Sequence, residues 1–264
     1  MRPPAPSRPS PWVLLPRPNP TARLRLFCFP YAGGGASIYT PWPSKLPPEV
    51  EVVAVQLPGR ENRIAEKPIA DLMELTEKIR DALVPFMDRP FAFYGHSNGG
   101  LMAFELARLL RREGRTGPLL VATGGRPAPQ TVIEGPVIHA LPEDEFRDTL
   151  RRYNGTPEEV LQNAEIMALI SPMLRADFAL GETYDYTPEP PLEVPVAAYG
   201  GMTDAEAPAW SVEAWREQAA GEFRVVMFPG GHFFINENRD MVLAELTRDL
   251  QGVLRQLPVT QAHA

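Results

Sequence analysis

Short apolar runs alternate with helix-like segments through most of this chain, and no other feature of the sequence limits its fold so strongly. The runs are bounded by Gly or Pro, as buried strands often are. They cover residues 24–29, 50–55, 91–94, 119–123, 194–200 and 223–228, and a short edge strand is also expected at 12–15. Segments with apolar residues three and four positions apart, as a helix on a sheet face requires, lie at 69–87, 100–112, 210–219 and 236–254. The alternation predicts an α/β fold with a mostly parallel, doubly wound sheet.

The alternation stops between residues 126 and 191, where helical patterns at 142–152, 157–163 and 165–180 are not separated by a convincing strand. An insertion between two core strands is the simplest interpretation, and it would form a helical lid. We expect this lid to move, with hinges at Gly135-Pro136, Gly155 and Gly181; a rigid insertion that completes the core is the alternative. The rest is predicted as one domain at 21–255, with a Pro-rich N-terminal tail at 1–20 and a C-terminal tail at 256–264.

Composition and charge exclude several classes of function. A formal net charge of −7 argues against a broad nucleic-acid interface, which needs a basic face. The longest apolar run near the N-terminus, from Trp12 to Leu15, is too short for a signal peptide or a membrane span. The one cysteine, Cys28, is expected as a core thiol, and it leaves no disulfide framework or paired-cysteine metal site. We therefore expect a cytoplasmic protein that acts without nucleic acid, membrane or bound metal.

The sequence Gly95-His96-Ser97-Asn98-Gly99-Gly100 directly follows a predicted strand and precedes a predicted helix. This is the G-x-S-x-G pattern in the strand–turn–helix context of a nucleophile elbow. Glycines suit its sharp turn, because a side chain at position 95 or 99 would collide with a neighbouring strand or helix. The Ser97 hydroxyl would then stand exposed at a helix N-terminus, which favours developing negative charge. A tight glycine turn with a capping serine is the alternative, but the context favours a nucleophile in an α/β-hydrolase fold.

A serine hydroxyl needs a base, and the base needs a carboxylate that orients it. Of the four histidines, His96 lies inside the elbow and is expected to point away, His139 lies in the predicted lid and His263 lies in the tail. His232 remains, on the loop after the last predicted strand. Asp204 leaves the carboxyl end of the strand at 194–200, the edge where open α/β sheets build their sites.

Ser97, Asp204 and His232 occur along the chain in the order that this fold uses, and they are the predicted catalytic residues. Asp177 and Asp185, in or near the insertion, are the alternative acids.

A carbonyl under attack needs two hydrogen-bond donors for its oxyanion, and each is worth roughly 2.7–4 kcal/mol of barrier. One is predicted to be the backbone N–H of Asn98, directly after the nucleophile. The other should come from Tyr31-Ala32-Gly33-Gly34-Gly35, the loop after the first main strand, with Ala32 as the donor and Tyr31 as the alternative. A phosphate-binding loop is disfavoured, because the run lacks the Gly-Lys-Ser/Thr ending of a P-loop and the spacing of a dinucleotide fingerprint.

Five motifs, in order along the chain, together resemble the external type II thioesterases of polyketide and nonribosomal peptide synthesis. They are Phe27-Cys28-Phe29-Pro30-Tyr31-Ala32-Gly33-Gly34-Gly35, Gln56-Leu57-Pro58-Gly59-Arg60, Gly95-His96-Ser97, Leu174-Arg175-Ala176-Asp177-Phe178 and Gly230-Gly231-His232-Phe233-Phe234. The resemblance covers residues 12–255 and is far more specific than the elbow alone. It implies an α/β-hydrolase that releases acyl or aminoacyl groups from the phosphopantetheine arms of acyl or peptidyl carrier proteins, clearing stalled or wrongly primed chains. Matched by position, it also implies Ser97, Asp204 and His232 as the triad and Ala32 and Asn98 as the oxyanion amides.

The sequence departs from this family at Asn98, where members often have methionine. The oxyanion role survives because it uses the backbone N–H, and the polar side chain bears on the acyl pocket instead. The implied mechanism has His232 deprotonate Ser97 as it attacks, and then activate the water that hydrolyses the acyl-enzyme. It requires no metal or bound cofactor, since the phosphopantetheine arm belongs to the substrate.

Three further groups of residues admit both a functional and a structural interpretation. A basic cluster would dock an acidic carrier protein or, as we favour, offset a helix dipole: Arg108, Arg111, Arg112 and Arg115. A group in the insertion would line an acyl tunnel or pack the lid: Met167, Met173, Phe178 and Tyr184. Arg60 and Arg63 would meet a phosphate or, as we favour, lie in a solvated loop.

Two other functions are compatible with the same residues. An esterase or lipase acting on small oxygen esters would use the same triad. A non-catalytic carrier-binding protein would keep the fold without turnover, although an intact set of candidate catalytic residues argues against it.

Overall fold

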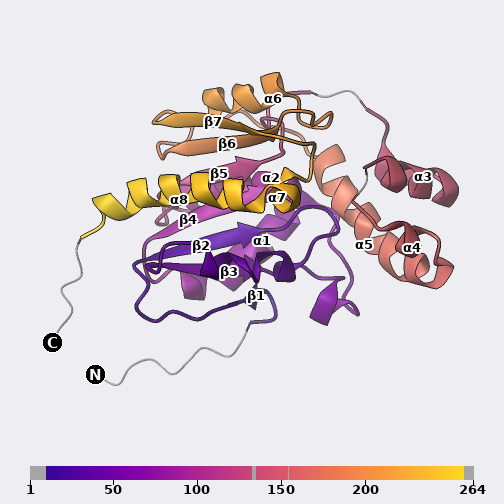
Figure 1. Cartoon of the computed structure of the whole chain (residues 1–264), viewed down its shortest axis with the longest axis horizontal. Helices are drawn as coiled ribbons and strands as arrows, with labels where there is room; N and C mark the ends of the chain where they lie inside the picture. Colours follow the sequence, from indigo (N-terminus) through magenta and orange to yellow (C-terminus); the bar gives the residue numbers. More distant parts are fainter. Residues whose placement is uncertain (1–9, 133–134, 154, 259–264) are drawn as a thin grey trace.

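The computed structural model describes residues 10–132, 135–153 and 155–258. Its centre is a seven-stranded sheet in the order β1-β3-β2-β4-β5-β6-β7. The strands are β1 (Val13–Leu14), β2 (Leu24–Phe29), β3 (Val50–Val55), β4 (Phe91–His96), β5 (Val121–Gly124), β6 (Val196–Gly201) and β7 (Phe223–Phe228). β1 runs antiparallel to β3 at one edge, and all other neighbours are parallel. The predicted α/β fold with a mostly parallel sheet is confirmed (Figure 1).

Helices connect the strands close to where the sequence predicts them. They are α1 (Leu72–Leu83), α2 (Asn98–Arg112), α6 (Ala209–Glu213), α7 (Phe234–Glu237) and α8 (Arg239–Gln256), with 3₁₀ turns between them. α1 begins later than expected because the Asp71 side chain accepts a hydrogen bond from the Glu74 N–H at 2.7 Å and caps the helix there. The segment expected as one helix at 210–219 is divided, since after α6 the chain tightens into the 3₁₀ helix η6 (Ala214–Gln218).

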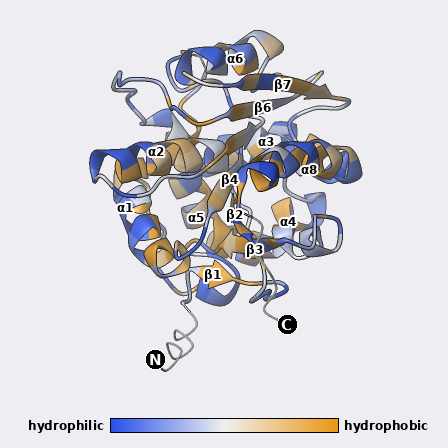
Figure 2. Cartoon of the chain, turned by 90° about the vertical axis from the view of Figure 1, so that its left-hand side faces the viewer, coloured by the Kyte–Doolittle hydropathy of each residue, from blue (hydrophilic) through white to orange (hydrophobic). Residues whose placement is uncertain are grey.

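The two faces of the sheet are covered by different helices, and the alternation of side chains along β2 shows how. Phe27 and Phe29 belong to a core shared with α1 and α2, whereas Leu26 and Cys28 belong to one shared with α8. Figure 2 shows the apolar strands between these helices. Cys28 is fully buried, and burial raises the pKa of its thiol, which confirms the predicted core thiol.

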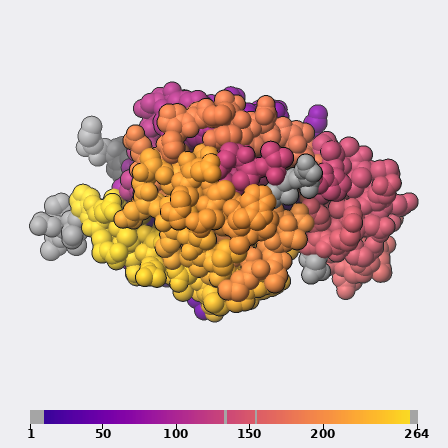
Figure 3. Space-filling view, turned by 90° about the horizontal axis from the view of Figure 1, so that it is seen from above, coloured from indigo at the N-terminus to yellow at the C-terminus, as the bar shows by residue number. Residues whose placement is uncertain are grey.

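The strand–helix alternation is interrupted between β5 and β6. A short 3₁₀ helix, η5 (Ile138–Ala140), is followed by α3 (Glu143–Tyr153), α4 (Glu158–Leu161) and α5 (Ala164–Glu182), which form the expected helical insertion. The insertion has a small hydrophobic cluster of its own. It projects beyond one end of the sheet in Figures 1 and 3. We call these helices the lid.

The two ends of the chain are only partly described, and the edge strand expected at 12–15 is present as β1. Of the predicted tails, residues 1–9 and 259–264 lie outside the described residues, whereas Val13 and Leu14 form the edge strand β1. Gly181, one of the expected hinges, is the penultimate residue of α5, and the hinge stays a prediction. In the described ranges, no helix combines the length and apolar character needed to cross a bilayer.

Candidate active site

The turn between β4 and α2 has the backbone of a nucleophile elbow. Ser97 has φ 54° and ψ −120°, a backbone conformation with positive φ that non-glycine residues rarely adopt. Glycine is required on both sides, since a Cβ at Gly95 would lie 2.0 Å from the Gly99 carbonyl oxygen, and one at Gly99 would lie 2.0 Å from that of Phe29. Ser97 is partly exposed between two buried neighbours. The turn therefore presents the serine side chain at the carboxyl edge of the sheet.

His232 and Asp204 meet at the same edge. His232 follows β7, Asp204 follows β6, and the His232 Nδ1 lies 2.9 Å from Asp204 Oδ2. The other carboxylate oxygen accepts hydrogen bonds from the N–H groups of Glu206 at 2.9 Å and Ala207 at 3.1 Å. Burial raises the pKa of Asp204, but the hydrogen bond and charge of His232 and the two backbone donors outweigh it, so this pKa lies below its ordinary value. The carboxylate is ionised at neutral pH and leaves the His232 Nε2 for proton transfer.

His96, the residue before the serine, supports the loop that carries His232. It is fully buried, and its Nε2 lies 2.8 Å from the His232 carbonyl oxygen. The two imidazole rings lie 5.4 Å apart, which places His232 beside the elbow. Burial, with the nearby His232, lowers the pKa of His96 from 6.5 to about 3. His96 is therefore neutral at physiological pH, and its Nε2–H donates to the loop rather than acting as the base.

The remaining candidate bases and acids lie elsewhere. His139 contacts the Glu182 carboxylate in the lid, and His263 is outside the described residues. Asp185 is exposed. Asp177 is buried, and its carboxylate binds the guanidinium of Arg60 through two contacts of 2.7 Å. The structure thus brings Asp204, and neither alternative acid, to His232.

The loop after β2 turns sharply at the predicted oxyanion site. Gly33 has φ 78°, its N–H donates to Asp177 Oδ2 at 2.7 Å, and the Gly34 N–H donates to the Tyr31 carbonyl at 2.9 Å. In the described part of the chain, the N–H groups of Tyr31 and Ala32 donate to no protein acceptor. Ala32 stays the predicted donor, with Tyr31 as the alternative.

Asn98 is the first residue of α2, so its backbone N–H has no partner within the helix. Its side chain has a separate use: Nδ2 donates to the Asp177 carbonyl oxygen at 2.6 Å, and Oδ1 accepts from Arg126 Nη1 at 3.3 Å. The asparagine that replaces the family's usual methionine therefore ties the elbow to α5. Sequence reasoning missed this contact.

Arg60 and Arg63 do not lie in a solvated loop, and that expectation is wrong. Both side chains are buried. Arg60 pairs with Asp177, while Arg63 pairs with Glu66 and lies over the Trp12 ring, 4.0 Å from its centroid. The two arginines are buried because each has a carboxylate partner and further backbone acceptors. The sequence offered a signal for Arg60 alone, since it ends the motif Gln56-Leu57-Pro58-Gly59-Arg60, and nothing comparable for Arg63.

The other two groups have mainly structural contacts. Three arginines of the basic cluster pair with Glu189, and the fourth pairs with Glu113: Arg108, Arg111, Arg112 and Arg115. Met167 and Met173 lie in the lid cluster. The Tyr184 hydroxyl contacts Glu105, and Phe178 packs on aromatic rings of α3. These contacts give both groups partners within the protein. Carrier docking, the helix-dipole role of the arginines and the acyl tunnel stay predictions.

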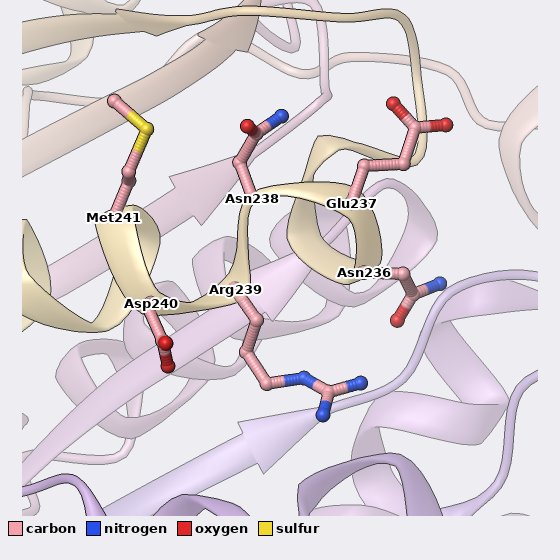
Figure 4. A pocket seen from close by; sticks show the side chains of 6 residues that line it. All are labelled: Asn236, Glu237, Asn238, Arg239, Asp240 and Met241. Carbon is pink, nitrogen blue, oxygen red and sulfur yellow. The ribbon is translucent and has the colours of Figure 1, made fainter.

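A surface hollow elsewhere does not belong to this site. It has a volume of about 400 Å³ and is lined by Asn236, Glu237, Asn238, Arg239, Asp240 and Met241, at the junction of α7 and α8 (Figure 4). None of the predicted catalytic residues lines it. Among the described residues, no cluster of His, Cys, Asp or Glu has the arrangement of a metal site.

Comparison with known proteins assigns this geometry to a family. A model of the thioesterase domain matches residues 24–250. The gramicidin S biosynthesis protein GrsT of Aneurinibacillus migulanus is 44% identical over 243 residues, covering 92% of this chain and 95% of that protein. The structure of the type II thioesterase BorB, from the borrelidin biosynthetic cluster, is 37% identical with a TM-score of 0.82, covering 90% of this chain and 97% of that one.

A second solved structure agrees. The RedJ thioesterase, from the prodiginine pathway of Streptomyces coelicolor, is 39% identical with a TM-score of 0.81, covering 86% of this chain and 90% of that one. The chain therefore belongs to the thioesterase family and, as its five motifs predicted, to the type II thioesterases of polyketide and nonribosomal peptide synthesis.

Proposed function

We propose that this enzyme hydrolyses acyl or aminoacyl thioesters from the phosphopantetheine arms of acyl or peptidyl carrier proteins, and so edits an assembly line that makes polyketides or nonribosomal peptides. The observation that carries the proposal is the 2.9 Å contact between His232 and Asp204 beside a strained, partly exposed Ser97. Family membership supplies the substrate class. The relatives named in gramicidin, borrelidin and prodiginine biosynthesis support the assembly-line setting.

In the proposed mechanism, His232 Nε2 removes the proton of the Ser97 hydroxyl as its oxygen attacks the thioester carbonyl carbon. Asp204 holds Nδ1 protonated and stabilises the imidazolium that forms. The backbone N–H groups of Ala32 and Asn98 donate to the oxyanion. The protonated His232 then returns its proton to the departing pantetheine sulfur.

Deacylation reuses the same groups. His232 Nε2 removes a proton from a water molecule as it attacks the acyl-enzyme ester, and the second tetrahedral intermediate collapses when Ser97 Oγ leaves with the proton. The carboxylic acid and the free enzyme result. Since an enzyme must share a compartment with its carrier-bound substrates, the cytoplasmic location expected from the sequence remains part of the proposal.

A hydrolysis panel tests the reaction and the substrate class together. One carrier protein is loaded with several acyl and aminoacyl groups, and each kcat/KM is compared with that for a small oxygen ester of the same acyl group. We expect the carrier thioesters to be hydrolysed with the higher kcat/KM. A large preference for the oxygen esters would establish the esterase instead.

Labelling separates an enzyme from a non-catalytic binding protein. A fluorophosphonate should modify the wild-type protein at Ser97 and leave Ser97→Ala unmodified, as seen by mass spectrometry of the intact protein. If the wild-type protein is not labelled, the catalytic proposal fails.

A further inference from the structure

Asp177 is a buried carboxylate that the catalytic mechanism does not use. It lies in α5 of the lid, yet its carboxylate contacts the core: Oδ2 accepts the Gly33 N–H at 2.7 Å, and both oxygens bind the Arg60 guanidinium at 2.7 Å. The exposed fractions of the Asp177 and Arg60 side chains are 3% and 5%. A buried carboxylate with both oxygens engaged is held in one position.

Arg60 also contacts Gly34, the next residue of the predicted oxyanion loop. Its Nη1 also donates to the Gly34 carbonyl at 3.1 Å, and its Nε and Nη2 contact the Pro58 carbonyl at 3.3 Å. Two residues that follow Ala32 are thereby held, one through its N–H and one through its carbonyl group. The Ala32 N–H is left facing no protein acceptor within the described chain.

The main chain of Asp177 contacts the second oxyanion donor. Its carbonyl oxygen accepts the hydrogen bond from Asn98 Nδ2 at 2.6 Å. One lid residue therefore contacts the residue after Ala32 and also Asn98 itself, although these two segments come from opposite sides of β4 in the sequence.

We propose that Asp177 is a positioning residue which makes the oxyanion hole depend on the docked state of α5. The inference rests on the proposed function, because it takes the N–H groups of Ala32 and Asn98 as the oxyanion donors. If α5 lifted, the Gly33 N–H would lose its acceptor, and the Arg60 charge would be left buried without its carboxylate, which is strongly unfavourable. The loop turn at Gly33, with φ 78°, would lose the contact that fixes it.

The lid is therefore held to the core most firmly at Asp177. Its contacts on the side of His232 are weaker: the Tyr153 hydroxyl donates to the exposed Glu206 at 2.7 Å, and Gly155 packs against the Phe233 ring. The side of the lid near Tyr153 and Gly155 is therefore the one that moves to admit substrate, while α5 near Asp177 keeps the oxyanion donors in place.

The test uses Asp177→Asn, which keeps the size of the side chain and removes its charge. We expect kcat to fall at least about tenfold with KM changed by less than about threefold, because a misplaced oxyanion donor weakens the transition state more than the ground state. The inhibition constant of a trifluoromethyl ketone, which forms a tetrahedral adduct with Ser97, should rise by a similar factor. If the role of Asp177 were purely structural, the variant would unfold at a lower temperature. Its kcat and its ketone inhibition constant, corrected for the folded fraction, would then stay at wild-type values.

Two further variants make the result decisive. Glu66→Gln removes the partner of Arg63 in a neighbouring loop, and it should leave kcat and ketone affinity at wild-type values. Arg60→Lys keeps the positive charge and loses the bidentate contact with Asp177, so kcat and ketone affinity should fall by a smaller factor. If Asp177→Asn does not fold, Arg60→Lys takes its place in the test. Wild-type kcat and ketone affinity in a folded Asp177→Asn or Arg60→Lys protein would overturn the proposal.

A small oxygen ester is assayed beside the carrier thioester in every case. If the wild-type protein cleaves the ester and not the thioester, the proposed function fails, while the ester kcat of Asp177→Asn still tests the positioning role.

Discussion

At the scale of single residues, two histidines close in space have different chemistry because their surroundings differ. His232 is partly exposed and has a carboxylate on Nδ1. His96 is fully buried, and its Nε2 contacts a backbone carbonyl. Burial disfavours the charged imidazolium, so His96 stays neutral. In the proposed mechanism the Asp204 carboxylate stabilises the imidazolium of His232. The sequence distinguishes the two histidines by their positions relative to the strands. It does not show that His96 holds the loop that carries His232.

Asp204→Asn should reduce kcat by roughly 10⁴-fold with the fold intact, as in other Ser-His-Asp enzymes. The N–H groups of Glu206 and Ala207 both donate to Oδ1, so the asparagine will keep its oxygen there and present its NH₂ group to His232. The imidazole then takes the wrong tautomer, with the proton on Nε2. Steady-state kinetics measure the loss, and Asp185→Asn, which changes an exposed carboxylate, is the control. Near-full activity of Asp204→Asn would assign the acid role to another carboxylate.

His96→Gln should make folding less sensitive to acid. Because burial holds the pKa of His96 at about 3, below the ordinary 6.5, the unfolded chain binds a proton first as the pH falls. The stability that this residue contributes is complete above pH 6.5 and is lost between 6.5 and 3, at up to about 1.4 kcal/mol per pH unit. Glutamine can donate to the same carbonyl and does not titrate. Urea unfolding at pH 7, 6 and 5 should show the smaller slope for the variant; parallel curves would refute the assignment.

At the scale of elements, the elbow depends on how directly β4 leads into α2. β4 extends beyond the predicted end to include Gly95 and His96, which pair with β2 and β5. The strand therefore runs directly into Ser97, whose N–H donates to the Gly124 carbonyl at 2.6 Å. No loop intervenes between the sheet and the helix, and the serine backbone is held on both sides. This rigidity suits the role proposed for Ser97, because a nucleophile must stay aligned with its base.

Gly99→Ala should destabilise the protein and lower its activity. The added Cβ would lie 2.0 Å from the Phe29 carbonyl oxygen and 2.9 Å from that of Pro30, and these backbone atoms cannot rotate away. Overpacking of this kind costs typically about 1–3 kcal/mol, or roughly 2–12 °C in Tm. Thermal unfolding by circular dichroism measures it. Gly117→Ala is the matched control, since its Cβ would meet no atom within 4 Å. Equal Tm values for the two variants would contradict this packing argument.

At the scale of the whole molecule, the lid joins parts of the chain that are distant in sequence. α5 contacts the loops after β2 and β3 through Asp177, and the end of α3 contacts the loop after β6 through Tyr153. The lid thus reaches across the carboxyl edge of the sheet, from the oxyanion loop to the loop that carries Asp204 (Figure 1). The first attachment is a buried ion pair and the second is an exposed hydrogen bond, so the two sides differ in strength.

Hydrogen exchange should resolve this difference within the lid. We expect the amides of α3 and α4 to exchange faster than those of α5 near Asp177, which should approach the protection of β4 and β6. Attaching an acyl pantetheine phosphonate to Ser97 should then protect α3 and α4 while changing α5 little. Mass spectrometry of peptic peptides measures both states. Equally fast exchange along all three lid helices would restore the view that the lid moves as one unit.

The sequence by itself determined the features that depend on neighbours along the chain. Hydrophobic period separates strands from helices, glycine spacing predicts the turn at Ser97, and chain order with strand ends selects Asp204 and His232, which the structure brings together. These signals are local, because the period of an element and the backbone angles of a turn are set by a few consecutive residues.

Only the tertiary structure decided how distant polar groups pair. Arg60 and Asp177 are 117 positions apart, and each alone would be expected in water. Folding places them in one buried contact, because an unpaired charge there would be too costly and the pair also satisfies the oxyanion loop. The same holds for Asn98 and the α5 carbonyl, and for His96 and the His232 carbonyl. Such pairs depend on how the chain folds back on itself, and the local hydrophobic periodicity of the sequence does not predict them.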